Sequence, residues 1–163
     1  MHAKIFQLSK KELNTSDFIS EHDFLNTEMW EIITSKTCAD YVSELNDTER
    51  IRVLQSINGS PSGMYYNEID NTLRVFDAKE YFKAKYQGFL EDIQKLSAIT
   101  LDSFSTSQND FQIRSDIYSL RTNFDDEIGT YMILDGCAIS MDKFVRMSQG
   151  ETFYVGTVFD FHF

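Results

Sequence analysis

The chain is poor in the residues that build metal centres and disulfide frameworks. Its 163 residues include two cysteines, three histidines and one proline. Zinc sites normally need paired Cys or His ligands at close spacing, and His2, His22 and His162 are far from one another and from both cysteines in sequence. Cys38 and Cys137 are about a hundred residues apart and read as buried thiols in a reducing compartment, although a long-range disulfide stays open. We expect no metal and no other cofactor.

Long apolar runs are also missing. No window approaches the roughly 18 apolar residues that a transmembrane helix requires, and the first residues lack the uninterrupted apolar segment of a secretory signal. We therefore expect a cytoplasmic protein without membrane contact. The composition is that of a globular chain, with 42% hydrophobic and 14% aromatic residues, whereas disordered chains contain few aromatics.

Positive charge is scarce as well. The chain has 26 acidic and 15 basic residues, a net charge of −11. Between Glu12 and Glu49 the only base is Lys36. A chain with this balance is repelled by nucleic acids and by anionic membranes and is attracted to basic proteins. We expect a basic protein partner and no direct binding of nucleic acid.

The hydrophobic periodicity predicts an α+β fold. Residues 12–57 read as an acidic, mostly helical third of the chain with a break near 35–38, in which Tyr41 and Leu45 continue the helical spacing of Trp30 and Ile33. The predicted helix N-caps are Thr27, Asn46 and Asp77, and residues 58–63, which include the only proline, read as a loop. Residues 64–77 read as a hairpin that turns at Asp70-Asn71, and the strongest amphipathic helix covers 78–96. A polar loop at 103–109 precedes a second amphipathic helix, and residues 130–163 read as rich in β-structure.

These elements fit one globular domain over residues 1–163. We predict an antiparallel or mixed sheet of about four to six strands, with helices packed mainly on one face. The last twelve residues alternate between an apolar and a mixed side, which is typical of a half-buried strand. We expect this strand to pack against the helix over 78–96, and His162 to lie beside Asp160.

One possible site lies in the C-terminal half. Cys137 follows a buried strand and a glycine turn, with His162 as a potential base and Asp135 or Asp160 to orient it. The Asp-Gly-Cys sequence lacks the glycine spacing of a nucleophile elbow. A small enzyme or ligand-binding domain built around Cys137 and His162 is therefore an alternative to a non-enzymatic role.

The acidic segment 12–49 is the more informative feature. On a helix, Asp40 with Glu44 and Glu28 with Glu31 are like-charge neighbours, which cost a few tenths of a kcal/mol and add nothing to the fold. The segment is either a solvated face or an electrostatic docking surface. The predicted partner-binding residues are Glu21, Asp23, Glu28, Glu31, Asp40 and Glu44, with Trp30 as a possible anchor.

The expected function is that of a small acidic, non-enzymatic interaction protein. Its carboxylates would take the place of phosphates on a basic, nucleic-acid-handling protein. Immunity proteins against nuclease toxins, and phage or mobile-element inhibitors of host defence, use the same physics, an analogy of mechanism and not of sequence. A homo-oligomeric structural protein joined through its aromatic strands is a further alternative.

Overall fold

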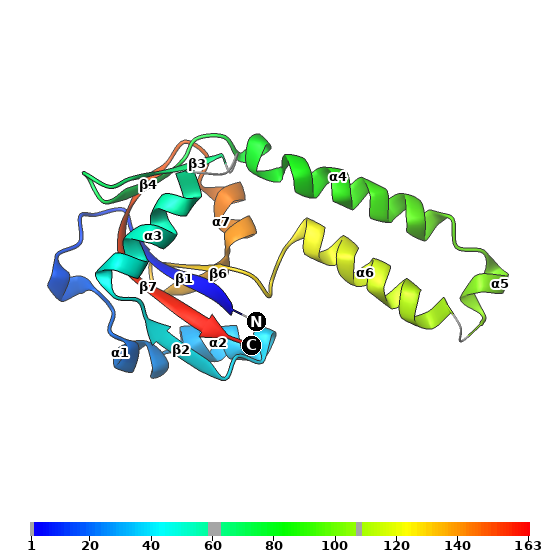
Figure 1. The fold of residues 1–163 in the computed structure, drawn as a ribbon, viewed down its shortest axis with the longest axis horizontal. Helices are drawn as coiled ribbons and strands as arrows, with labels where there is room; N and C mark the ends of the chain where they lie inside the picture. The colour runs from blue at the N-terminus through cyan, green and yellow to red at the C-terminus, as the bar shows by residue number, and fades with distance from the viewer. Residues whose placement is uncertain (1, 59–62, 107–108) are drawn as a thin grey trace. The chain divides into compact units, whose positions relative to one another are not determined.

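The computed structural model describes residues 2–58, 63–106 and 109–163 (Figure 1). The predicted loop around the only proline, Pro61, and part of the predicted loop at 103–109 therefore lie outside the described residues. The contacts divide the chain into two compact units. Unit 1 comprises residues 1–81 and 127–163, and unit 2 comprises residues 82–126. The predicted α+β class with a mixed sheet is confirmed.

Unit 1 contains the seven-stranded sheet. Its strands are β1 (His2–Ser9), β2 (Tyr41–Glu44), β3 (Met64–Asn67), β4 (Thr72–Val75), β5 (Tyr131–Leu134), β6 (Cys137–Ser140) and β7 (Thr152–His162). Its helices are η1 (Thr15–Asp17), α1 (Glu21–Leu25), α2 (Glu28–Thr37), α3 (Asp47–Asn58) and α7 (Met141–Met147), and α4 (Ala78–Ser97) begins in this unit.

The C-terminal strand β7 is the centre of the sheet. The strand order is β3-β4-β7-β1-β5-β6, and β2 also pairs with β7. β7 runs antiparallel to β1, β2 and β4, while β1 and β5 form the parallel pair. Because His2 pairs with His162, the two ends of the chain lie side by side (Figure 1).

The sheet has one strand more than the upper end of the predicted range, because residues 41–44 are not helical. Helix α2 ends where Cys38 adopts a left-handed backbone conformation with φ 56°, a common helix C-cap. The chain then pairs Tyr41–Glu44 with the edge of β7. The helical spacing of Tyr41 and Leu45 was therefore misleading, since pairing with β7 outweighs a weak local preference.

Several local predictions are confirmed. The hairpin of β3 and β4 turns at Asn71, which has φ 49° and tolerates this conformation better than most residues. Asn46 caps α3 by accepting the N–H of Glu49 at 3.0 Å, and its amide donates back to the Glu49 carboxylate at 2.7 Å. Asp77 caps α4 by accepting the N–H of Glu80 at 3.1 Å.

A β-bulge changes the face to which the side chains of β7 point. Leu8 of β1 pairs with Val155 while Phe6 pairs with Val158, so two steps along β1 match three along β7. One extra residue moves every later side chain to the opposite face. The single alternation predicted for the C-terminal residues is therefore interrupted between Val155 and Phe159, which are all buried, and the predicted alternation of buried and partly exposed residues resumes from Phe159 to His162.

The aromatic residues of β7 accordingly pack on two sides of the sheet. Phe159 stacks on Phe24 of α1, with ring centroids 4.8 Å apart. Phe153, before the bulge, packs against Phe144 of α7 at 5.1 Å. These rings find their partners within unit 1, in place of the predicted helix over 78–96. The larger apolar cluster contains Ile5, Phe24, Met29, Ile33, Val42, Tyr131, Ile133, Phe159 and Phe161.

The bulge is held by the buried amide of Gln7. Its side-chain oxygen accepts the N–H groups of Thr157 and Ile19, both at 3.0 Å, and its nitrogen donates to the carbonyl of Asp17 at 2.8 Å. A Cβ at Gly156 would lie 2.4 Å from that oxygen. The absence of a side chain at Gly156 is therefore what allows Gln7 to occupy the bulge.

We expect Gly156→Ala to destabilise unit 1 by about 2–3 kcal/mol, because the new methyl group displaces an amide that makes three buried hydrogen bonds. Urea unfolding measures the loss. In a Gln7→Ala background the same substitution should cost much less, since the clash is gone. Equal costs in both backgrounds would show that Gln7 is not the reason for the glycine.

Unit 2 consists mainly of two helices, and among its described residues no apolar side chain is fully buried. Its described elements are the remainder of α4, α5 (Leu101–Phe104) and α6 (Asp110–Phe124). Asp92 is its one buried residue among those described, and it accepts hydrogen bonds from Lys95, Ser119 and Asn123. These contacts join α4 to α6. In the described part of the chain, no helix combines the length and apolar character needed to cross a membrane.

Candidate functional site

The predicted partner-binding residues come from three neighbouring elements of unit 1. Glu21 and Asp23 lie on α1, Glu28 and Glu31 in the first turn of α2, and Glu44 at the end of β2. Figure 1 shows α1, α2 and β2 close together around the end of β7 that carries the C-terminus. The structure brings α1 and β2 into contact, because the Glu21 carboxylate accepts the backbone N–H of Glu44 at 3.3 Å.

Most of these carboxylates have no cation beside them. Asp23, Glu28, Glu31 and Glu44 are exposed. Among the ion pairs of the described residues, none includes any of these four side chains. Lys36 is the single base of segment 12–49, and its Nζ lies 3.4 Å from Oε1 of Glu127. The negative charge of α1, α2 and β2 is therefore left facing solvent.

The fold explains part of this charge. Asp23 accepts a hydrogen bond from the hydroxyl of Ser20, the N-cap of α1, at 2.7 Å. Thr27 caps α2, so Glu28 and Glu31 occupy its first turn. Carboxylates in a first turn interact favourably with the helix dipole, by about 0.3–1 kcal/mol each. The prediction that these acids add nothing to the fold is therefore wrong for α1 and α2.

The like-charge neighbours expected from helical spacing are only partly present. Glu28 and Glu31 do share one helix. Asp40 and Glu44 do not, because Asp40 precedes a strand and Glu44 ends it. In a strand, residues four apart lie about 13 Å from each other, too far for strong repulsion.

Trp30 is part of the protein interior more than of its surface. It is half-buried, packs against the apolar cluster of the sheet, and its ring meets Phe24 edge-on at a centroid distance of 5.8 Å. A tryptophan in this position supports α1 and α2. It is not the freely exposed anchor that a docking surface would present.

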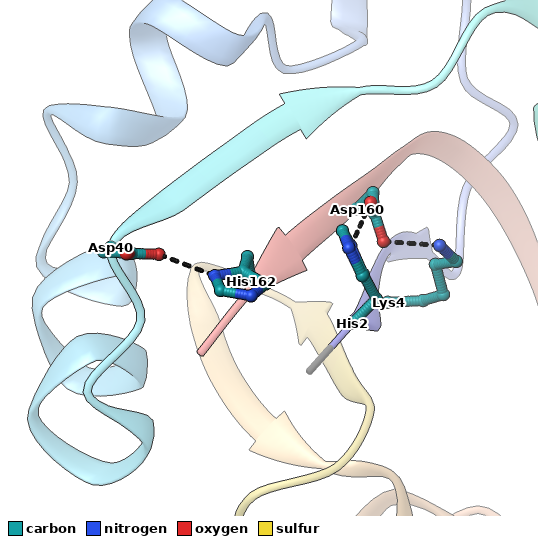
Figure 2. A network of polar contacts seen from close by, with 5 residues as sticks. All are labelled: His2, Lys4, Asp40, Asp160 and His162. Carbon is teal, nitrogen blue, oxygen red and sulfur yellow. Dashed lines mark hydrogen bonds and ion pairs between the residues drawn. The ribbon is translucent and has the colours of Figure 1, made fainter.

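Asp40 belongs to a polar network at the chain ends (Figure 2). Its carboxylate lies 3.0 Å from Nδ1 of His162, and this hydrogen bond lowers the pKa of Asp40 below its ordinary value. The rings of His162 and His2 meet edge-on at 5.2 Å. Asp40 is therefore engaged within the protein, in contrast to the four unpaired carboxylates.

Asp160 forms the second half of this network. Its two carboxylate oxygens lie 2.5 Å from Nζ of Lys4 and 2.8 Å from Nδ1 of His2 (Figure 2). Burial raises the pKa of Asp160, but the hydrogen bonds from Lys4 and His2 outweigh it and the net pKa is lowered. His162 was predicted to lie beside Asp160. In the structure the Asp160 carboxylate contacts Lys4 and His2 of β1, and His162 forms a hydrogen bond with Asp40.

We expect Asp160→Asn to reduce stability at neutral pH and to lose this effect in acid. Because the folded pKa of Asp160 lies below its unfolded value, its contribution is present above about pH 4 and is lost as pH falls through the folded pKa. Urea unfolding at several pH values measures the difference between wild type and variant. A difference that does not shrink in acid, or an equal effect of Glu91→Gln at an exposed position of α4, would contradict this role.

The structure separates the residues of the alternative site. Cys137 pairs with Leu134, which pairs with Leu8, whereas His162 pairs with His2 at the other end of β1. Six residues along a strand span about 20 Å. Cys137 and His162 therefore cannot form a dyad. The prediction of buried thiols is also wrong, since Cys38 and Cys137 are both exposed.

Among the described residues, no three His, Cys, Asp or Glu side chains are arranged to hold a metal ion. No known family model matches the chain, and neither a curated protein nor a solved structure is similar to it.

Proposed function

We propose that this chain is a non-enzymatic interaction protein that binds a basic protein through the exposed carboxylates of α1, α2 and β2. One observation carries the proposal: Asp23, Glu28, Glu31 and Glu44 face solvent and, among the described residues, form no ion pair. Unpaired charges of one sign attract a partner of opposite sign and increase its association rate.

The requirements of the fold account for only part of this surface. Helix dipoles favour acids at the starts of α1 and α2. They do not favour Glu44, which ends a strand, and they do not explain why Lys36 is the only base of the segment. A face selected for solubility alone can intersperse both signs. The excess of one sign supports a docking role.

A nucleic-acid-handling protein is the class of partner that fits best. Such proteins present Arg and Lys side chains to phosphates, and carboxylates can occupy the same positions. The chain would then act as an inhibitor of its partner, in the manner of immunity or phage and mobile-element proteins. We place it in the cytoplasm, where its two exposed thiols would stay reduced.

Capture from a cell lysate tests the proposal. The immobilised chain should retain a basic protein at low salt and release it as salt rises, because exposed charge pairs are screened over about 10 Å at 0.1 M salt. The released protein should then lose nucleic-acid binding when the chain is added back. Retention that does not depend on salt, or partners that are all acidic, would contradict an electrostatic surface.

A further inference from the structure

The acidic surface of α1, α2 and β2 also contains two exposed apolar side chains. Leu25 on α1 is 41% exposed and Ile32 on α2 is 42% exposed. Each of them follows a glutamate of its own helix by four residues, Leu25 after Glu21 and Ile32 after Glu28. Residues four apart on a helix are neighbours, with Cβ atoms about 5–6 Å from each other. The surface therefore combines a carboxylate with an apolar side chain at two places.

Both glutamates are open to a cation from another molecule. Within the described residues, no base of the chain forms an ion pair with Glu21 or Glu28. Lys36 is in the last turn of α2, but its Nζ lies 3.4 Å from Oε1 of Glu127. The Glu21 carboxylate accepts the backbone N–H of Glu44 at 3.3 Å, and this neutral donor does not cancel the negative charge.

We propose that each glutamate and its apolar neighbour form a seat for one lysine or arginine side chain of the basic partner, an inference that rests on the function proposed above. The aliphatic stem of the partner's side chain covers Leu25 or Ile32, and its cationic group meets Glu21 or Glu28. Lysine and arginine commonly bury their stems on apolar surface while their charged ends stay in water. The four-carbon stem of lysine is long enough to join the two halves of a seat.

Other side chains of a partner would use only half of each seat. A purely apolar side chain brings no charge to the glutamate and removes water from a carboxylate that it cannot replace with a hydrogen bond. A short cationic side chain reaches the glutamate but leaves Leu25 or Ile32 exposed. A long cationic side chain meets both needs, and the burial of its stem adds an attraction that salt does not screen. The seats therefore select for the length of a cationic side chain as well as for its charge.

Titration of the full chain with two synthetic peptides tests this inference without any variant. One peptide alternates lysine with serine. The other replaces every lysine by 2,4-diaminobutyrate, which carries the same charge on a stem that is two methylenes shorter. Wild type should bind the lysine peptide at least about tenfold more tightly, because the shorter stems bury less apolar area. Equal dissociation constants for the two peptides, or no measurable binding of the lysine peptide, would overturn the inference.

Substitution of the two apolar side chains assigns this preference to the seats. Leu25→Ser with Ile32→Ser should reduce the ratio of the two dissociation constants to about one and keep its salt dependence, since no charge is removed. The matched control is Ile69→Ser with Met147→Ser, exposed apolar positions of unit 1 outside α1, α2 and β2. The control should keep the wild-type ratio. A preference that survives in the seat variant, or that is lost in the control, would contradict the assignment.

Charge reversal at Glu28 and Glu31 distinguishes a failure of this inference from a failure of the proposed function. If Glu28→Lys with Glu31→Lys leaves the binding of both peptides unchanged, the surface does not attract cations and both proposals fail. If the double variant weakens the binding of both peptides while wild type does not discriminate between them, the proposed function stands and only the seats are disproved.

Discussion

A chain truncated after Gly150 should not form the sheet of unit 1. The truncation removes β7, which pairs with β1, β2 and β4 and therefore joins strands that are distant in sequence. It also removes Phe153, Val155, Val158, Phe159 and Phe161, all of which are fully buried. At about 1.5–3 kcal/mol for each buried side chain, the loss is on the order of 10 kcal/mol, comparable to the whole stability of a typical domain.

Hydrogen exchange of the β1 amides is the appropriate measurement, because helices of unit 2 could retain circular dichroism after unit 1 has unfolded. A truncation after His162, which removes only the partly exposed Phe163, is the matched control and should keep these amides protected. Protected β1 amides in the chain that ends at Gly150 would show that β7 is not the central strand.

Reversing the charge of Glu28 and Glu31 should weaken partner binding about 30-fold at low salt. Each exposed ion pair contributes about 0.2–1 kcal/mol, and reversal replaces attraction with repulsion at two positions. The effect should decline as salt rises, because both side chains are exposed and screened by ions. Titration of the purified partner with each variant at several salt concentrations measures it.

The same double substitution places two lysines in the first turn of α2, so it should also lower stability by about 1–2 kcal/mol. Thermal unfolding separates this cost from the loss of binding. Glu44→Lys is a useful companion variant, because Glu44 ends a strand and has no helix dipole to oppose the lysine. It should weaken binding without the destabilisation seen for α2.

Local patterns in the sequence predicted the elements whose signals are local. The caps at Asn46 and Asp77, the turn at Asn71 and the helix that begins at Ala78 depend on residues within a few positions of each other. The same is true of the apolar density of β7. Its status as a strand could be predicted, although its position between β1, β2 and β4 could not.

Long-range pairing decided the features that were missed. Nothing near Tyr41 indicates a strand, because that conformation depends on an edge of β7 more than a hundred residues later. The bulge at Gly156 depends on the distant amide of Gln7. Likewise, Asp160 contacts Lys4 and His2 because the register of β1 and β7 brings these three side chains together.

The acidic segment shows how structure changes the meaning of a charge pattern. The excess of acids could be counted from the sequence and the cap at Thr27 could be predicted, but the short helix α1, with its cap at Ser20 beside Asp23, could not.

The most direct test of the docking surface is one ratio of dissociation constants at low salt. The ratio compares two double variants that change the net charge by the same amount. One carries Glu28→Lys and Glu31→Lys on α2, and the other carries Glu91→Lys and Asp102→Lys at exposed positions of unit 2. We expect the α2 variant to bind the basic partner at least about tenfold more weakly than the unit 2 variant, because only the α2 variant reverses charge inside the proposed interface. Equal dissociation constants would mean that the position of the charge does not matter, and would contradict a docking surface on α1, α2 and β2.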